Sequence, residues 1–299
     1  MTLLDRWAND AKARGISRQT IDSYRYNLKY FENFLGKSID KADKIEIRDY
    51  VDAQRKEGLT TKTIRGRLNA LSSFYEFLIF EGLRVDNPVC AIRSRYINQY
   101  KTASEEHTHK LISIKEAANL VMCSFDPRDQ AMLVLLLKTG VRRSELLNMD
   151  VSDIDFSTGS IRLKPTAKRS NLVVFFDDEA ARFLQRWLEV RQQRNPTNDA
   201  LWISTWGKRV GHGSLNYMIR HVALRAGLHD EKSELMEEHF SAHCTRHWFT
   251  THLRRAGMPR EFIQELRGDV RKEAIDIYDH IDKEELRKSY LAHVPRLGV

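Results

Sequence analysis

The sequence predicts a mainly α-helical protein of two domains: a four-helix N-terminal domain, and a mostly helical second domain that carries one small antiparallel β-sheet. The chain has 299 residues, enough for two domains of roughly 150 residues each. Apolar residues recur at helical spacing along most of the chain, and glycines interrupt the pattern. Only two short runs, residues 161–163 and 172–175, look like β-strands, and a polar turn separates them.

The N-terminal domain is predicted from four amphipathic stripes that end at glycines. The first stripe ends at Gly15, and Ser17 is placed to cap a second helix that closes at Gly36. A third helix is expected over residues 44–57, and a fourth begins near Thr60. Four such helices with short connections form a small bundle.

Helical periodicity fails after the bundle, where the chain becomes polar. We therefore expect a first domain over residues 1–92, an interdomain linker over residues 93–111 and a second domain over residues 112–299. The linker contains Arg95, which could contact a polyanion.

The second domain opens with Ser113 and Glu116, which have the spacing of a capping box. A buried helix is predicted over residues 129–138, and a short helix follows that carries Arg142 and Glu145. Further helices are predicted over residues 178–193, 214–226, 243–256, 259–266 and 272–280.

The formal net charge of +8 favours a polyanionic partner such as nucleic acid. The alternative is a basic protein with no such partner. Lys62, Arg65 and Arg67 lie near the start of the fourth predicted helix. They are either a solvated helix face or, as we prefer, a surface that binds DNA phosphates.

The cellular compartment is predicted from cysteine usage and from the N-terminus. Cys90, Cys123 and Cys244 are scattered without pairing signals, which fits a reducing, cytoplasmic location. The N-terminus has charged residues where a signal peptide needs an apolar run, and the longest apolar run is too short to span a bilayer. We expect no membrane contact.

Neither a nucleotide nor a metal ion is predicted as a cofactor. The chain has no phosphate-binding GxxxxGK motif. His239, His243 and His247 recur every four residues, which could suggest zinc. However, Phe240 and Ser241 are expected to precede the helix, so the three histidines would not share a face.

The second domain contains the residue types that cutting and rejoining DNA without ATP requires. Arg142 and Arg246 could hold the non-bridging oxygens of a phosphodiester, where charge develops in the transition state. Tyr278 could attack the phosphorus, and His243 could take or steer its proton. Lys168, at the tip of the predicted hairpin, could protonate the leaving 5′ oxygen.

Each of these residues also has an ordinary structural interpretation when it is taken alone. Tyr278 would be a half-buried core residue, Arg142 a surface charge, and His243 with Arg246 a common helix face. The joint pattern, and no single residue, favours catalysis.

Three segments carry a family resemblance: TGVRRSELLNMDVSDID, then HCTRHWFTTHLRRAG, then IYDHI. In this order and at these spacings they resemble the tyrosine recombinase family, which includes phage-type integrases and Xer-type resolvases. The resemblance covers the whole second domain, and the four-helix part is similar to the family's core-binding domain. It implies a site-specific DNA recombinase that forms a 3′-phosphotyrosyl intermediate.

The resemblance also implies residue roles. Arg142 would be the first catalytic arginine, with Glu145 as the buried acid that orients it. His243 and Arg246 would form the HxxR motif, and Tyr278 would be the nucleophile.

The hairpin lysine is Lys168 by preference. Lys164 is the alternative, because the length of the turn varies and the common Gly-Lys-Gly form is absent.

One position departs from the family pattern. Nine positions before Tyr278, where the family usually has histidine or tryptophan, this chain has Asp269. A carboxylate beside a phosphate costs energy unless it is protonated or paired with a cation. Our hypothesis is that Arg267 or Arg271 neutralises Asp269, or that Asp269 orients a catalytic arginine, and that activity is kept.

The resemblance implies double-stranded DNA with a specific recombination site as substrate, a homo-tetramer on two such sites, and a location with the nucleoid. The segment after residue 282 is expected to dock on a neighbouring protomer. Two other functions remain open: a DNA-binding module without catalysis, and a type IB topoisomerase with similar residues.

Overall fold

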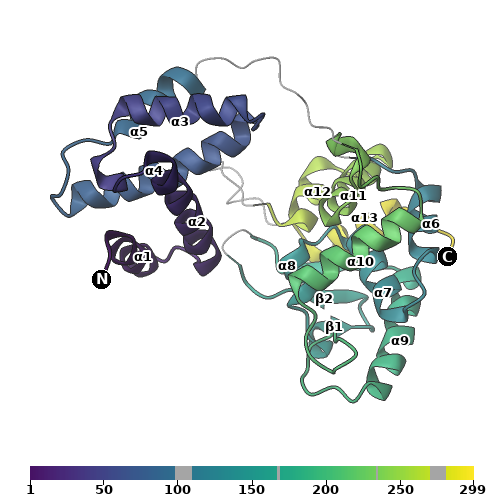
Figure 1. Ribbon diagram of the computed structural model, residues 1–299. Coiled ribbons are helices and arrows are strands. Elements are labelled where there is room, and N and C mark those ends of the chain that lie inside the picture. The colour runs from purple at the N-terminus through teal and green to yellow at the C-terminus, as the bar shows by residue number, and fades with distance from the viewer. Residues whose placement is uncertain (98–109, 167–168, 234, 270–280) are drawn as a thin grey trace. The chain divides into compact units, whose positions relative to one another are not determined.

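The computed structural model describes residues 1–97, 110–166, 169–233, 235–269 and 281–299. It confirms the predicted mainly α-helical fold with one small antiparallel sheet. The chain forms two compact units, residues 1–105 and 106–299, and each unit has its own hydrophobic core (Figure 1).

The first unit contains the four predicted helices and a fifth short one. They are α1 (Leu3–Ala13), α2 (Arg18–Leu35), α3 (Lys44–Lys56), α4 (Thr61–Phe80) and α5 (Pro88–Ile92). The side chains of Ser17 and Thr60 cap α2 and α4, because each accepts a hydrogen bond from the backbone three residues later. Trp7, Leu28 and Phe74 are fully buried between the helices and form the centre of the core.

Helical structure continues past the predicted start of the linker. After α5 the chain makes a π-helical turn over Arg93–Ile97. The side chains of Ile92 and Ile97 are buried in the core of the first unit, so apolar burial keeps this turn attached to it.

The second unit is arranged around one buried helix, α7. Its helices are α6 (Ile114–Met122), α7 (Pro127–Thr139), α8 (Arg143–Leu147), α9 (Asp178–Gln193), α10 (His212–Arg225), α11 (Ala242–Arg255), α12 (Arg260–Arg267) and α13 (Lys283–His293). Helix α7 packs against α6, α9 and α11 (Figure 1), and every residue from Gln130 to Thr139 is buried. Each described helix in either unit is too short or too polar to cross a lipid bilayer.

The small sheet has three strands rather than the two predicted. Strands β1 (Ile154–Asp155), β2 (Ser160–Arg162) and β3 (Val173–Phe175) pair antiparallel in the order β1-β2-β3. Strand β1 spans only two residues, which is too short for an alternating pattern to reveal it.

The C-terminal segment docks on its own unit in this structure. The hydroxyl of Tyr290 on α13 is buried and donates to the carbonyl of Lys138, at 3.0 Å. The buried ammonium of Lys138 lies 2.6 Å from Asp177, 2.5 Å from Glu179 and 2.6 Å from the carbonyl of Pro295. In this structure the polar groups of Tyr290 and Pro295 therefore find their hydrogen-bond partners within the same chain. Docking of the segment on a neighbouring protomer stays a prediction.

Candidate active site

The turn between α7 and α8 positions Arg142. Helix α7 ends at Thr139 and is capped by Gly140, whose φ of 58° favours glycine. A Cβ at Gly140 would lie 2.3 Å from the ring of Phe249. Arg142 is then the N-cap of α8. The buried carboxylate of Glu145 accepts from the backbone N–H of Arg142 at 2.7 Å and from its Nη1 at 3.0 Å. Glu145 therefore holds both the backbone and the guanidinium of Arg142, while its role in catalysis stays a prediction.

Helix α11 carries Arg246 into the same region. Its side chain is 8% exposed; Nη1 donates to the carbonyl of Gly140 at 2.6 Å, and Nη2 donates to the carbonyl of Arg267 at 2.9 Å. Burial lowers the pKa of Arg246 to about 10, with the positive charges of Arg142 and Arg267 acting in the same direction and Asp269 opposing them. The guanidinium thus stays charged at neutral pH in a region rich in positive charge.

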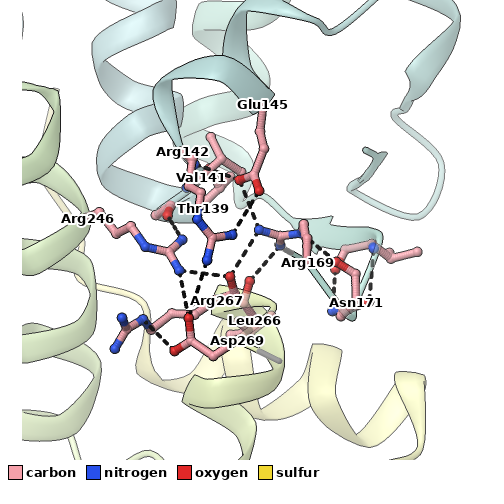
Figure 2. Close-up of polar contacts among 12 residues, drawn as sticks. Thr139, Val141, Arg142, Glu145, Arg169, Asn171, Arg246, Leu266, Arg267 and Asp269 are labelled. Carbon is pink, nitrogen blue, oxygen red and sulfur yellow. Dashed lines mark hydrogen bonds and ion pairs between the residues drawn. The ribbon is translucent and has the colours of Figure 1, made fainter. Parts of the chain in front are cut away.

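Asp269 lies between these arginines, just after the end of α12 (Figure 2). Its Oδ1 is 3.2 Å from Nη2 of Arg246 and 3.5 Å from Nη2 of Arg142. Its Oδ2 is 3.1 Å from Nε of Arg267, an ion pair whose geometry falls short of a hydrogen bond. The predicted pairing of Asp269 with Arg267 is confirmed, whereas Arg271 lies outside the described residues.

Arg169 is a central residue of the site that the sequence did not reveal. Its side chain is fully buried, and its guanidinium donates to Glu145 Oε2 at 3.0 Å and to the carbonyls of Leu266 at 2.8 Å, Arg267 at 3.1 Å and Asn171 (Figure 2). Burial lowers the pKa of Arg169, and the charge of Glu145 opposes this.

Two neighbours of Arg169 strengthen the link between the β2–β3 hairpin and the end of α12. The backbone N–H of Ser170 donates to the carbonyl of Gly268 at 3.3 Å, and its hydroxyl donates to the carbonyl of Asp269 at 3.1 Å. A Cβ on Gly268 would lie 2.5 Å from Cγ of Arg169. The hairpin segment and the end of α12 therefore approach too closely for any residue other than glycine at position 268. The glycine before Asp269 was the available sequence signal for this contact.

Two predicted catalytic residues, Lys168 and Tyr278, lie outside the described residues. The alternative lysine, Lys164, is described: its ammonium pairs with Asp150, which also pairs with Arg209. Lys164 is therefore already engaged with a carboxylate at the base of the hairpin.

His243 and Arg246 line two neighbouring basic cavities. One, of about 320 Å³, includes Arg142 in its wall. The other, of about 460 Å³, includes Arg267 and Arg255. The predicted HxxR pair thus stands between two spaces that are suited to anions.

The repeat of histidines around α11 does not form a metal site in the described part of the chain. Helix α11 begins at Ala242, so His239 precedes it, as predicted. Within the ranges that the structure describes, no three His, Cys, Asp or Glu side chains are grouped to hold a metal ion.

The predicted DNA-binding residues of the first unit have different surroundings. Lys62, Arg65 and Arg95 are exposed. Arg67 is half-buried, with its guanidinium carbon 4.4 Å from the centre of the Tyr30 ring.

Comparison with known proteins identifies the family. The model of the phage integrase family matches residues 102–285, and that of the phage integrase N-terminal SAM-like domain matches residues 4–82. The tyrosine recombinase XerC of Haemophilus influenzae is 28% identical, over 99% of this chain and 98% of the relative. The tyrosine recombinase XerD of Oceanobacillus iheyensis is 26% identical, over 95% and 94%.

A solved structure shows the same fold. The crystal structure of a lambda integrase dimer bound to a COC′ core site has a TM-score of 0.70 and 18% identity, over 94% of this chain and 78% of that one. The chain therefore belongs to the phage integrase family, the tyrosine recombinases that its motifs resemble.

Proposed function

We propose that this chain cleaves and rejoins DNA at a specific site, with Tyr278 as the nucleophile and a 3′-phosphotyrosyl intermediate. One observation carries the proposal. The guanidiniums of Arg142 and Arg246 converge on a single oxygen, Oδ1 of Asp269, at 3.5 and 3.2 Å. Two arginines that share one acceptor oxygen form a binding place for a small oxyanion.

In the proposed mechanism the two guanidiniums hold the non-bridging oxygens of the scissile phosphate. Negative charge grows on these oxygens as the phosphorus becomes pentavalent, so fixed cations stabilise the transition state more than the ground state. Glu145 and Arg169 keep Arg142 in position, because they anchor it from a buried ion pair.

The remaining steps take one proton from the attacking phenol and give one proton to the leaving 5′ oxygen. The phenolic oxygen of Tyr278 bonds to phosphorus while His243 takes its proton, and the bond from phosphorus to the 5′ oxygen breaks. Lys168 gives that oxygen a proton. We prefer Lys168 because the ammonium of Lys164 pairs with Asp150. The phosphotyrosyl link keeps the bond energy, so the chemistry calls for neither a nucleotide nor a metal cofactor.

Double-stranded DNA is the proposed partner. Several related solved structures contain DNA, among them XerH site-specific recombinase bound to difH substrate. We assign phosphate contacts on the first unit to the exposed Lys62, Arg65 and Arg95, and a lesser one to Arg67, which packs on Tyr30. The start of the second domain at residue 112, a homo-tetramer on two DNA sites, and a cytoplasmic location on the nucleoid belong to the same proposal.

The proposal is tested by trapping the covalent intermediate on sheared genomic DNA and sequencing the attached ends. We expect the wild type to yield protein–DNA adducts at one recurrent sequence, and Tyr278→Phe to yield none. Tyr217→Phe removes an exposed hydroxyl from α10 and serves as the matched control with wild-type yield. Adducts that persist in Tyr278→Phe would contradict the proposal.

Two outcomes identify the other functions. DNA binding without any adduct in the wild type indicates a binding module that has lost catalysis. Relaxation of a supercoiled plasmid that lacks the recurrent sequence indicates a type IB topoisomerase.

A further inference from the structure

A side chain of the chain itself, that of Asp269, lies in the binding place between the two catalytic arginines. Figure 2 shows Arg142, Arg246 and Arg267 all directed at the carboxylate of Asp269. A carboxylate and a phosphodiester are both anions that offer two oxygens to guanidinium donors. They compete for the same donors, and they repel each other when both are ionised at one place.

Arg267, like the partly exposed Arg142 and unlike the buried Arg246, has guanidinium donors to spare among the described residues. Among the described residues the guanidinium of Arg267 pairs with Oδ2 of Asp269 through Nε, its side chain is 34% exposed, and its terminal nitrogens make no hydrogen bond there. It lines the cavity of about 460 Å³ together with His243 and Arg246. Its guanidinium is therefore within reach of an anion that enters beside Arg246.

The backbone carbonyls of residues 267–269 are all held by hydrogen bonds from other segments. The carbonyl of Arg267 accepts from Arg246 at 2.9 Å and from Arg169 at 3.1 Å. The carbonyls of Gly268 and Asp269 accept from Ser170. A rotation of the Asp269 side chain can thus open the place between the arginines without unwinding α12.

The charges favour replacement of the carboxylate by a phosphate. Four guanidiniums, those of Arg142, Arg169, Arg246 and Arg267, share the two carboxylates of Glu145 and Asp269. This leaves an excess of positive charge that attracts a second anion. Arg267 can stay paired with the displaced carboxylate of Asp269. Its positive charge then compensates most of the repulsion between that carboxylate and the phosphate.

We propose that Asp269 is an internal counterion that fills the scissile-phosphate place until DNA binds, and that Arg267 is a third phosphate-binding arginine. This inference rests on the proposed function, because that function defines the phosphate.

The test uses a tetrahedral oxyanion in place of DNA, so it depends neither on a recombination sequence nor on Tyr278. Sodium tungstate is titrated into the full-length protein at constant ionic strength, and its affinity is measured by calorimetry. We expect Asp269→Asn to bind tungstate about fivefold more tightly than wild type, and Arg267→Met about fivefold more weakly, as for the loss of one partly exposed charge interaction. Arg267→Lys, which preserves charge but not the fork of donors, should fall between Arg267→Met and wild type.

Matched controls on the exposed start of α12 separate local from general charge effects. Glu261→Gln and Arg260→Met change the net charge by the same amounts and should leave the affinity for tungstate within about twofold of wild type. A rise in tungstate affinity for Asp269→Asn together with a fall for Arg267→Met is the result expected of a counterion and a ligand-binding residue. Mere loss of structure would lower the affinity in both variants. Equal or weaker binding by Asp269→Asn, or unchanged binding by Arg267→Met, overturns the inference. Failure to trap an adduct through Tyr278, with these opposite signs present, counts against the proposed chemistry alone.

Discussion

Replacement of Arg169 by methionine should strongly destabilise the second unit. Methionine keeps most of the apolar stem of arginine and removes the guanidinium. That group makes four hydrogen bonds, to Glu145, Asn171, Leu266 and Arg267, and its side chain is fully buried. Three backbone carbonyls and one carboxylate oxygen lose this donor in the variant, although the carbonyl of Arg267 keeps Arg246 and Oε2 of Glu145 keeps the N–H of Arg142.

The expected magnitude follows from the burial of Glu145. Removing one partner of a buried ion pair typically costs about 3–5 kcal/mol, because a charge is left without compensation. Glu145 keeps the N–H and Nη1 of Arg142, so we expect a loss of about 3 kcal/mol in the free energy of unfolding. This is a large part of the roughly 5–15 kcal/mol that stabilises a typical domain.

Urea unfolding followed by circular dichroism measures this loss. Arg162→Met, an exposed arginine on β2, is the matched control and should stay within about 0.5 kcal/mol of wild type. A double variant that adds Glu145→Gln should be less destabilised than the sum of the two single variants, because the two residues interact directly. If Arg169→Met lowers the free energy of unfolding no more than Arg162→Met does, the hydrogen bonds of the Arg169 guanidinium contribute no net stability.

Two further predictions concern the elements that support the site. Gly140→Ala should destabilise the second unit by about 2 kcal/mol or more in urea unfolding, since the added methyl group meets the ring of Phe249 at a positive φ, and a neutral effect would contradict this packing. Burial raises the pKa of Glu179, but hydrogen bonds from Lys138 and two backbone N–H groups outweigh burial, so the pKa lies below its ordinary value of 4.5. The stabilisation by ionised Glu179 is therefore present above pH 4.5 and is lost as the pH falls through the lower pKa of the folded state. The loss in free energy of unfolding of Glu179→Gln relative to wild type, measured by urea unfolding, should accordingly be greatest near pH 7 and shrink below pH 4. A loss that does not depend on pH would contradict the assignment.

Local signals in the sequence predicted the described helices well, whereas the helix predicted over residues 272–280 lies outside the described residues. Ser17, Thr60 and Ser113 each cap the helix that they were expected to start, because a cap and its partner lie only three residues apart. Such contacts depend on neighbouring residues and can be read without knowledge of the fold.

Contacts between distant segments were harder to predict. The guanidinium of Arg169 binds a carbonyl 97 residues further along the chain, and nothing in the polar turn around it distinguishes a buried arginine from an exposed one. Asp269 was expected to pair with a cation, but its position between Arg142 and Arg246 depends on how α12 packs beside α11. The roles of the catalytic residues stay predictions until Tyr278 is tested.

Two buried charged residues, Lys138 and Glu179, bind the backbone of the C-terminal segment and limit how that segment can move. Glu179 accepts from the backbone N–H groups of Leu297 at 2.9 Å and Gly298 at 2.7 Å, while Lys138 donates to the carbonyl of Pro295. Departure of the segment would strand these charged groups with fewer partners, which is unfavourable inside a protein. An equivalent stretch of polypeptide that offered one carbonyl and two N–H groups would satisfy them equally well. Detachment of residues 295–298 without a replacement partner is therefore unfavourable.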